Sequence, residues 1–220
     1  QDHPWYTGEK SLQIHHVIDI KAVEDLGKAF KHYNYNINHA HNLIVLPAEM
    51  ANACKFGVPL HRGKHSLGRA IGDDEKDKNV QALNTVENSG DYKAVVKEEK
   101  LFDTYPKATK EEMRDIKILL KEGDLCYDEE GNASSEKEMQ EDFLKQMNII
   151  SNKILKRISD FVWTINRDGR DYKPGNPCGC SGVNTMKEKK KIKVRGTDCK
   201  IKSHGRSPTN TTKTALKMGY

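Results

Sequence analysis

The sequence predicts a mostly helical α+β protein, and the spacing of its apolar residues carries this prediction. From Phe143 to Ile165, apolar residues recur every three or four positions, which is typical of a helix with one buried face. A similar spacing over 22–33 indicates a second helix. The short segment 12–14 and the apolar run at 43–46 are typical of strands.

The elements of the first third are expected in the following order. The strand 12–14 is followed by the helix 22–33, and a loop rich in Asn and His at 34–42 leads to the strand 43–46. Pro47 ends this second strand, because proline has no N–H to donate to a neighbouring strand.

Two capping boxes farther along indicate helix starts. They are Thr-x-x-Glu at 109–112 and Ser-x-x-Glu at 135–138, and Gly123 is expected to end the first of these helices. The polar segment 124–135 is expected to be an exposed loop. The second helix is expected to end near 167–169. Its buried face comprises Phe143, Met147, Ile150, Ile154, Ile158, Phe161 and Ile165.

Charge and composition divide the 220 residues into three parts. Residues 1–72 carry 8 Lys+Arg and 6 Asp+Glu, residues 73–150 carry 12 and 21, and residues 151–220 carry 17 and 5. The basic last third suits a polyanion, and a solvated tail explains it equally well. We expect a core at 1–72, a helical extension packed on it at 73–170, and a basic segment rich in Cys, Gly and Lys at 171–220.

Several classes of protein do not fit this composition. No apolar run approaches the roughly 20 residues that span a bilayer, so no membrane segment is expected. The first ten residues lack the apolar stretch of a secretory signal, and the chain begins with Gln1 rather than Met. We therefore expect a fragment of a longer protein. Five cysteines, an odd number, do not indicate a secreted disulfide framework.

Five side chains between positions 15 and 65 suit the hydrolysis of a phosphodiester. This reaction needs a base for the attacking water and positive charge for the phosphoryl and leaving oxygens. His15, His61 and His65 can form an open metal shell of neutral imidazoles, for Zn²⁺ or Mg²⁺. Because adjacent side chains of a strand face opposite ways, one of His15 and His16 is expected to face the ion and the other the attacking water, as the base. We assign Asn42 to accept the ring N–H of that base and fix its tautomer.

Pro59 precedes a further expected helix that carries two of these ligands. His61 and His65 lie four positions apart, so on a helix they share one face. Arg62 and Lys64 lie between them and are expected to contact phosphates that flank the cleaved bond.

The C-terminal segment contains a candidate for a second, structural zinc site. Its ligands would be Cys178, Cys180, Cys199 and His204. The C-x-C spacing is tighter than the usual C-x-x-C, so three free thiols in a Gly-rich segment are the alternative. Zinc there would compensate for the few apolar residues of this segment.

Three motifs in order over about 12–68 resemble the AHH family of nuclease toxins. They are IHH, NINHAHNLIVLP and HRGKHS. This family belongs to the His-Me finger (HNH/endonuclease VII) superfamily. Its pattern is a small residue before a His pair, then D-I-N-x-x-x-N-G-x-x-L-P, then H-x-G-x-H. Ile14 replaces the small residue and Leu43 replaces the Gly, and neither change removes a reactive group.

The resemblance implies a ββα-metal fold for residues 1–72 and a role for each matching residue. It makes His15 a metal ligand and His16 the general base, and it makes His61 and His65 the closing ligands. Asn42 matches the second Asn of the pattern. The first Asn of the pattern corresponds to Asn38, which we expect to shape the turn.

The resemblance also implies a biological context. Such domains sit at the C-terminus of bacterial polymorphic toxins, which contact-dependent or type VI secretion delivers into the cytoplasm of rival cells, and an immunity protein protects the producer. We therefore expect a metal-dependent endonuclease toxin that cuts DNA. Two alternatives stay open. One is an RNase with the same site, which needs no metal if His16 acts on a ribose 2′-OH. The other is a zinc-stabilised nucleic-acid-binding module whose histidines are structural.

Overall fold

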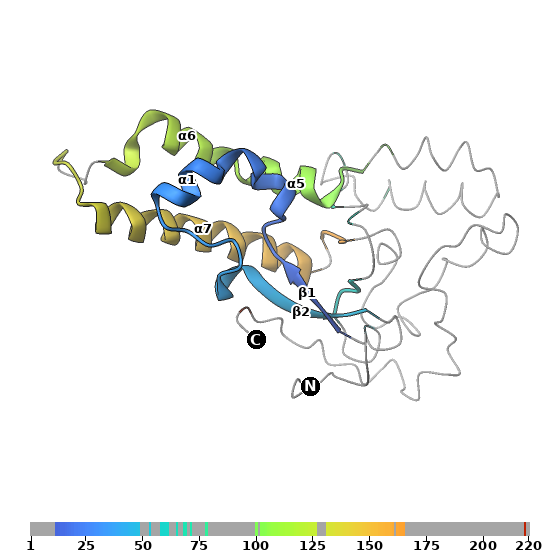
Figure 1. The fold of residues 1–220 in the computed structure, drawn as a ribbon. Coiled ribbons are helices and arrows are strands. Elements are labelled where there is room, and N and C mark those ends of the chain that lie inside the picture. Colours follow the sequence, from blue (N-terminus) through green and yellow to red (C-terminus); the bar gives the residue numbers. More distant parts are fainter. Residues whose placement is uncertain are drawn as a thin grey trace, which may run out of the picture.

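Two strands near the N-terminus form an antiparallel pair in the computed structural model of the protein. β1 (Leu12–His16) pairs with β2 (Leu43–Pro47), so that His16 lies opposite Leu43 (Figure 1). Both predicted strands are confirmed, and the first continues through the two histidines. The residues that the structure describes are 12–48, 53, 58–61, 65, 68–69, 71, 78, 100, 102–126, 131–160, 162–165 and 218.

The chain between the two strands forms two short helical turns and a loop. η1 (Ile20–Leu26) is a 3₁₀ helix that continues into α1 (Gly27–His32), and η2 (Ala40–Asn42) precedes β2. The helix predicted over 22–33 is therefore confirmed in position, but its first half has 3₁₀ geometry. Asp19 caps this turn, because its carboxylate accepts the backbone N–H of Lys21 at 2.8 Å.

The first helix of the second half begins earlier than the sequence predicted. α5 (Tyr105–Glu112) starts at an N-cap formed by Thr104, and α6 (Arg114–Glu122) follows. The predicted capping box at 109–112 is wrong, because Thr109 lies inside α5 and its hydroxyl donates to the Tyr105 carbonyl at 2.8 Å. Pro106 explains the true start, since proline is tolerated in the first turn of a helix. The predicted stop at Gly123 is confirmed by its φ of 77°.

The longest described helix, α7 (Glu136–Ser159), begins at the predicted capping box. The backbone N–H of Ser135 donates to the Glu138 carboxylate at 2.7 Å, and the N–H of Glu138 donates to the Ser135 hydroxyl at 3.3 Å. The predicted end near 167–169 is wrong. The N–H groups of residues 162 and 163 both turn back to the Arg157 carbonyl. This turn buries Ile165 in the core, although it lies outside the helix.

One apolar cluster joins the N-terminal strands to the later helices. It contains buried residues from 17–46, from α5 to α7, and from the turn after α7. Tyr33 stacks on Phe143 of α7, with ring centroids 4.7 Å apart at 11°. Figure 1 shows α1 beside α7, and the ring centroids of Phe30 on α1 and Phe143 on α7 lie 6.0 Å apart. The helices and the small sheet agree with the predicted α+β class, and the ββα-metal core stays a prediction. None of the helices described is long and apolar enough to cross a bilayer.

Phe143→Ala is expected to lower the free energy of unfolding by about 3–5 kcal/mol. Phe143 is fully buried and contacts the rings of Tyr33, Tyr35 and Phe30, so its removal leaves a cavity between α7 and the N-terminal segment. Urea denaturation measures the change. Ile149→Ala is the matched control, because Ile149 lies on the same helix and is 51% exposed. Equal effects of the two substitutions would contradict this packing.

Candidate active site and metal centre

At the end of β1, the side chains of His15 and His16 point to opposite faces of the strand. His15 is 1% exposed, whereas His16 is half-buried. This alternation is the one expected for neighbouring residues of a strand. His15 therefore faces the interior of the protein, and His16 is left at its edge.

His61 and His65 meet His15 through tertiary contacts. The backbone N–H of His61 donates to the Pro47 carbonyl at 2.9 Å, which ties this segment to the end of β2. The ring centroids of His61 and His65 lie 4.7 and 5.0 Å from that of His15. Neither residue is helical, so the predicted helix that was to carry both of them on one face is wrong at these two positions.

The three rings form a group that fits a metal ion. One ring nitrogen from each of His15, His61 and His65 lies within 4.8 Å of the others. The Nε2 atoms of His61 and His65 face each other at 2.9 Å. In a tetrahedral zinc site with Zn–N bonds of about 2.0–2.1 Å, neighbouring ligand nitrogens lie about 3.3 Å apart. The separation of the His61 and His65 nitrogens is therefore close to that in a metal shell.

Unpartnered nitrogens support the same interpretation. In the part of the chain that the structure describes, both ring nitrogens of His15 and the Nδ1 of His61 are buried without a hydrogen-bond partner. A buried polar atom left in this way costs roughly 1–3 kcal/mol. An ion bound to one ring nitrogen of His15 would supply the missing partner of that atom, so the residues fit the metal that the sequence predicted.

The protonation state of the buried rings also suits a metal. Burial lowers the pKa of His15 well below its usual value, and the neighbouring His61, His65 and His16 lower it further. Burial, with a smaller contribution from His65, lowers the pKa of His61 to about 4. Both rings are therefore neutral near pH 7, which is the form that coordinates a metal ion.

Asp19 contacts the histidine cluster through His65, and this contact was not predicted from the sequence. Its Oδ2 lies 2.5 Å from Nδ1 of His65. Burial raises the pKa of this carboxyl, but the hydrogen bonds from His65 and from the N–H of Lys21 outweigh burial, and the net pKa is lowered. Because 46 positions separate Asp19 from His65, no local pattern reveals the pair.

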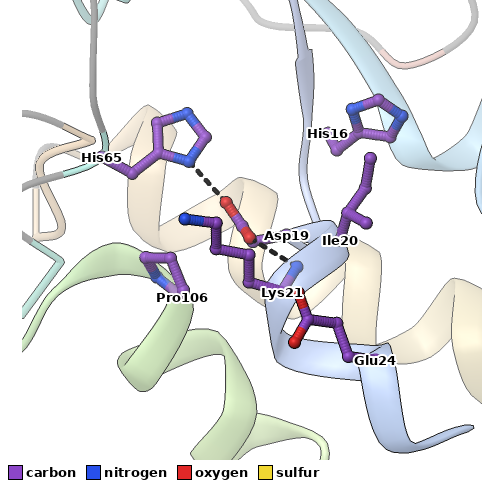
Figure 2. A pocket seen from close by; sticks show the side chains of 7 residues that line it. All are labelled: His16, Asp19, Ile20, Lys21, Glu24, His65 and Pro106. Carbon is purple, nitrogen blue, oxygen red and sulfur yellow. Dashed lines mark hydrogen bonds and ion pairs between the residues drawn. The ribbon is translucent and has the colours of Figure 1, made fainter.

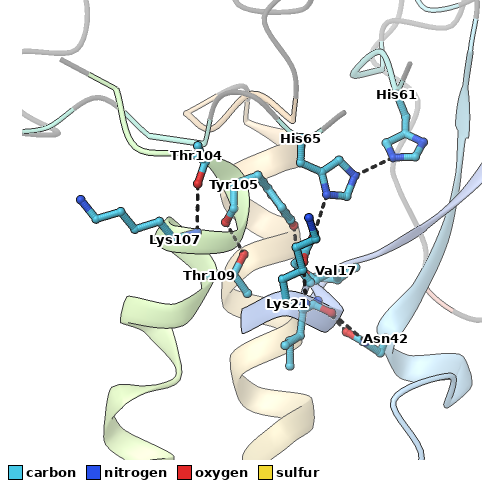
Figure 3. Close-up of polar contacts among 11 residues, drawn as sticks. Val17, Lys21, Asn42, His61, His65, Thr104, Tyr105, Lys107 and Thr109 are labelled. Carbon is cyan, nitrogen blue, oxygen red and sulfur yellow. Dashed lines mark hydrogen bonds and ion pairs between the residues drawn. The ribbon is translucent and has the colours of Figure 1, made fainter. Parts of the chain in front are cut away.

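Tyr105 is a second neighbour that the sequence did not reveal. Its ring lies edge-on to His15, with centroids 4.9 Å apart, and its hydroxyl donates to the Val17 carbonyl at 2.6 Å (Figure 3). Burial raises its pKa well above the usual value, so the hydroxyl stays protonated. The first turn of α5 therefore closes one side of the histidine cluster.

The amide that contacts His16 is that of Asn38, not that of Asn42. The Oδ1 of Asn38 lies 2.8 Å from Nε2 of His16. Asn42 is fully buried, and its Oδ1 instead accepts the N–H of Ile18 at 2.7 Å while its Nδ2 donates to the carbonyls of Ile18 and Ile37. The expected contact of Asn42 with His16 is therefore absent. Both ends of its amide are therefore used by backbone groups, those of Ile18 just after β1 and the carbonyl of Ile37 in the loop before η2.

An open pocket of about 600 Å³ lies between His16 and His65 (Figure 2). It is lined by His16, Asp19, Ile20, Lys21, Glu24, His65 and Pro106. Lys21 has no ion pair within the described residues, and Figure 2 shows its side chain extending to the His65 side of the pocket. The pocket is therefore lined by His16, by His65 of the histidine cluster and by the cation of Lys21.

Several predicted site residues lie outside the described part of the chain. They are Arg62, Lys64, Cys178, Cys180, Cys199 and His204, and Phe161 of the apolar stripe. The phosphate contacts and the structural zinc site therefore stay predictions. Cys126, which is described, is a half-buried free thiol.

Comparison with known proteins gives one match. Residues 3–117 match the model of AHH, described as a nuclease family of the HNH/ENDO VII superfamily with conserved AHH. No curated protein and no solved structure matches the chain. Ile14 stands where the family has Ala, and its side chain is 64% exposed, so its size does not disturb the core. The match confirms the resemblance noted over 12–68 and covers more than half of the 220 residues. The chain therefore belongs to the AHH family of nucleases.

Proposed function

We propose that this protein is a metal-dependent endonuclease that hydrolyses the phosphodiester bonds of DNA. Membership of a nuclease family supports the reaction class. The observation that carries the metal dependence is the convergence of two buried imidazoles and one half-buried imidazole, whose nitrogens lie within 4.8 Å of one another. The basic residues of the last third, 17 against 5 acidic ones, support a polyanionic substrate.

The histidines have two different roles in the proposed reaction. His15, His61 and His65 would hold the ion. When bound, the ion supplies Lewis-acid stabilisation of the charge on the phosphoryl and leaving oxygens. His16 borders the pocket and takes the proton of the attacking water. Because the Asn38 oxygen can only accept a hydrogen bond, Nε2 of His16 carries the hydrogen, and Nδ1 keeps the lone pair that accepts this proton.

The ends of the products distinguish DNA hydrolysis from the alternative RNase chemistry. Matched DNA and RNA strands are incubated with the protein, with and without EDTA. We expect DNA cleavage that leaves 3′-hydroxyl ends and stops with EDTA. Cleavage of RNA alone that resists EDTA and leaves 2′,3′-cyclic phosphates would instead indicate attack by a ribose hydroxyl, and would overturn the proposal.

Lys21→Ala is expected to weaken DNA binding by removing a phosphate contact in the pocket. The plot of log K against log[salt] should become less steep by about 1. Fluorescence anisotropy in a His16→Ala background measures binding without cleavage. Lys28→Ala is the matched control, because Lys28 is an exposed lysine of α1 that does not line the pocket. Identical slopes for the two variants would contradict a role of Lys21 in phosphate binding.

The motif order of this chain, shared with nuclease toxins, supports a role against competing bacteria. The chain would be the C-terminal effector of a polymorphic or type VI secreted toxin, would act in the cytoplasm of the target cell, and would be neutralised by a cognate immunity protein. Expression in a bacterium is expected to degrade the chromosome and arrest growth, while His16→Ala does neither. Equal growth with both forms would contradict the toxin role.

A further inference from the structure

The two oxygens of Asp19 have different fixed partners. Oδ1 accepts the backbone N–H of Lys21 at 2.8 Å and caps η1, while Oδ2 lies 2.5 Å from Nδ1 of His65 (Figure 2). Asp19 is 6% exposed, so water competes little for either oxygen. The carboxylate therefore connects the start of η1 to a ring of the histidine cluster.

A carboxylate at this position decides which nitrogen of His65 carries the hydrogen. An ionised carboxylate only accepts hydrogen bonds, so Nδ1 of the neutral ring must be the donor. The lone pair of His65 then lies on Nε2, which faces Nε2 of His61 at 2.9 Å. Metal-bound histidines commonly donate their other ring N–H to a carboxylate in this way.

We propose that Asp19 is a positioning residue that fixes His65 in the tautomer whose Nε2 is free to bind metal. The effect on metal affinity rests on the proposed function, whereas the effect on the tautomer does not. Asp19 contacts neither the other two ligands nor the proposed base in any hydrogen bond that the described residues make. It would therefore act only through His65.

Hydrogen bonds to Asn42 and Tyr105 hold the backbone just before Asp19 in place. The N–H of Val17 donates to the backbone carbonyl of Asn42, and the N–H of Ile18 donates to the side chain of Asn42. The Val17 carbonyl accepts the hydroxyl of Tyr105 (Figure 3). Because these bonds fix the residues between the histidine pair and Asp19, the carboxylate is placed before any metal arrives. Such preorganisation holds a ligand in its binding geometry.

Two substitutions of Asp19 separate its role as the N-cap of η1 from the contact of its carboxylate with His65. Asp19→Asn keeps an oxygen that can cap the N–H of Lys21, and its NH₂ then faces Nδ1 of His65. This favours the opposite tautomer, with the hydrogen on Nε2. Asp19→Ser also keeps a capping oxygen, but its short side chain leaves His65 without an imposed tautomer. Asp25→Asn is the control, because Asp25 lies in the same turn and pairs with Lys117 at the surface.

Two measurements test the proposal. Long-range ¹H–¹⁵N correlation spectra of the metal-free protein report the tautomer of His65, and competition with a chromophoric chelator reports the affinity for Zn²⁺. We expect Nδ1–H in the wild type and Nε2–H in Asp19→Asn. We also expect a loss of Zn²⁺ affinity of about 10–100-fold in Asp19→Asn, a smaller loss in Asp19→Ser, and none in Asp25→Asn.

The two measurements also separate failure of this inference from failure of the proposed function. The role of Asp19 is overturned if His65 keeps the wild-type tautomer in Asp19→Asn. It is also overturned if the wild type binds Zn²⁺ and Asp19→Asn binds it equally tightly. If the wild type binds no Zn²⁺ while its tautomer still switches in Asp19→Asn, the control of the tautomer is supported and the metal site of the proposed function fails.

Discussion

His16→Ala is expected to lower kcat for the nicking of supercoiled plasmid by about 10²–10⁴-fold. His16 borders the pocket, and its orientation by Asn38 leaves Nδ1 free to accept the proton of water. The substitution should leave Zn²⁺ affinity unchanged, because His16 is not one of the three clustered rings. A loss of cleavage with intact metal binding distinguishes a base from a ligand.

His32→Ala is the matched control for this prediction. His32 is an exposed histidine of α1 that does not line the pocket, so its removal should leave kcat unchanged. Asn38→Ala should lower kcat less than His16→Ala does, because it removes only the group that orients the ring. Wild-type kcat in His16→Ala would rule out His16 as the base.

His61→Ala is expected to abolish the stabilisation of the fold by Zn²⁺ together with cleavage. At a free Zn²⁺ concentration of 100 times Kd, a metal that binds only the folded state raises the free energy of unfolding by about 2.7 kcal/mol. Urea denaturation with Zn²⁺ or with EDTA should show this difference in the wild type and in His32→Ala. It should be absent in His61→Ala, which lacks one of the three clustered ligands. A variant still stabilised to the same extent by Zn²⁺ would exclude His61 as a ligand.

Local sequence signals predicted the elements that depend on neighbouring residues. The alternation of His15 and His16 follows from their place on a strand, and the capping box that begins at Ser135 needs only residues three positions apart. The end of α7 was missed because it depends on where the chain turns to bury Trp163 and Ile165. The apolar spacing of the stripe continues through this turn.

Contacts distant in sequence explain the parts of the site that were not predicted correctly. The spacing of His61 and His65 suggested a helix, whereas a backbone bond to Pro47 and the Asp19 carboxylate bring them to the cluster. The contact of Asn42 was predicted incorrectly for a related reason. The sequence shows that Asn42 follows the His pair. It does not show which backbone groups the side chain of Asn42 will contact in the folded protein.

Cleavage of supercoiled plasmid by the wild type, before and after removal of metal, tests the central claim most directly. The protein is treated with EDTA, dialysed, and supplied with Mg²⁺, Mn²⁺ or Zn²⁺ in turn, with His16→Ala treated in parallel. We expect nicking and linearisation to stop with EDTA and to return with at least one metal in the wild type alone. Cleavage that survives complete chelation, or no cleavage with any of the three metals, would contradict the assignment of a metal-dependent DNA endonuclease.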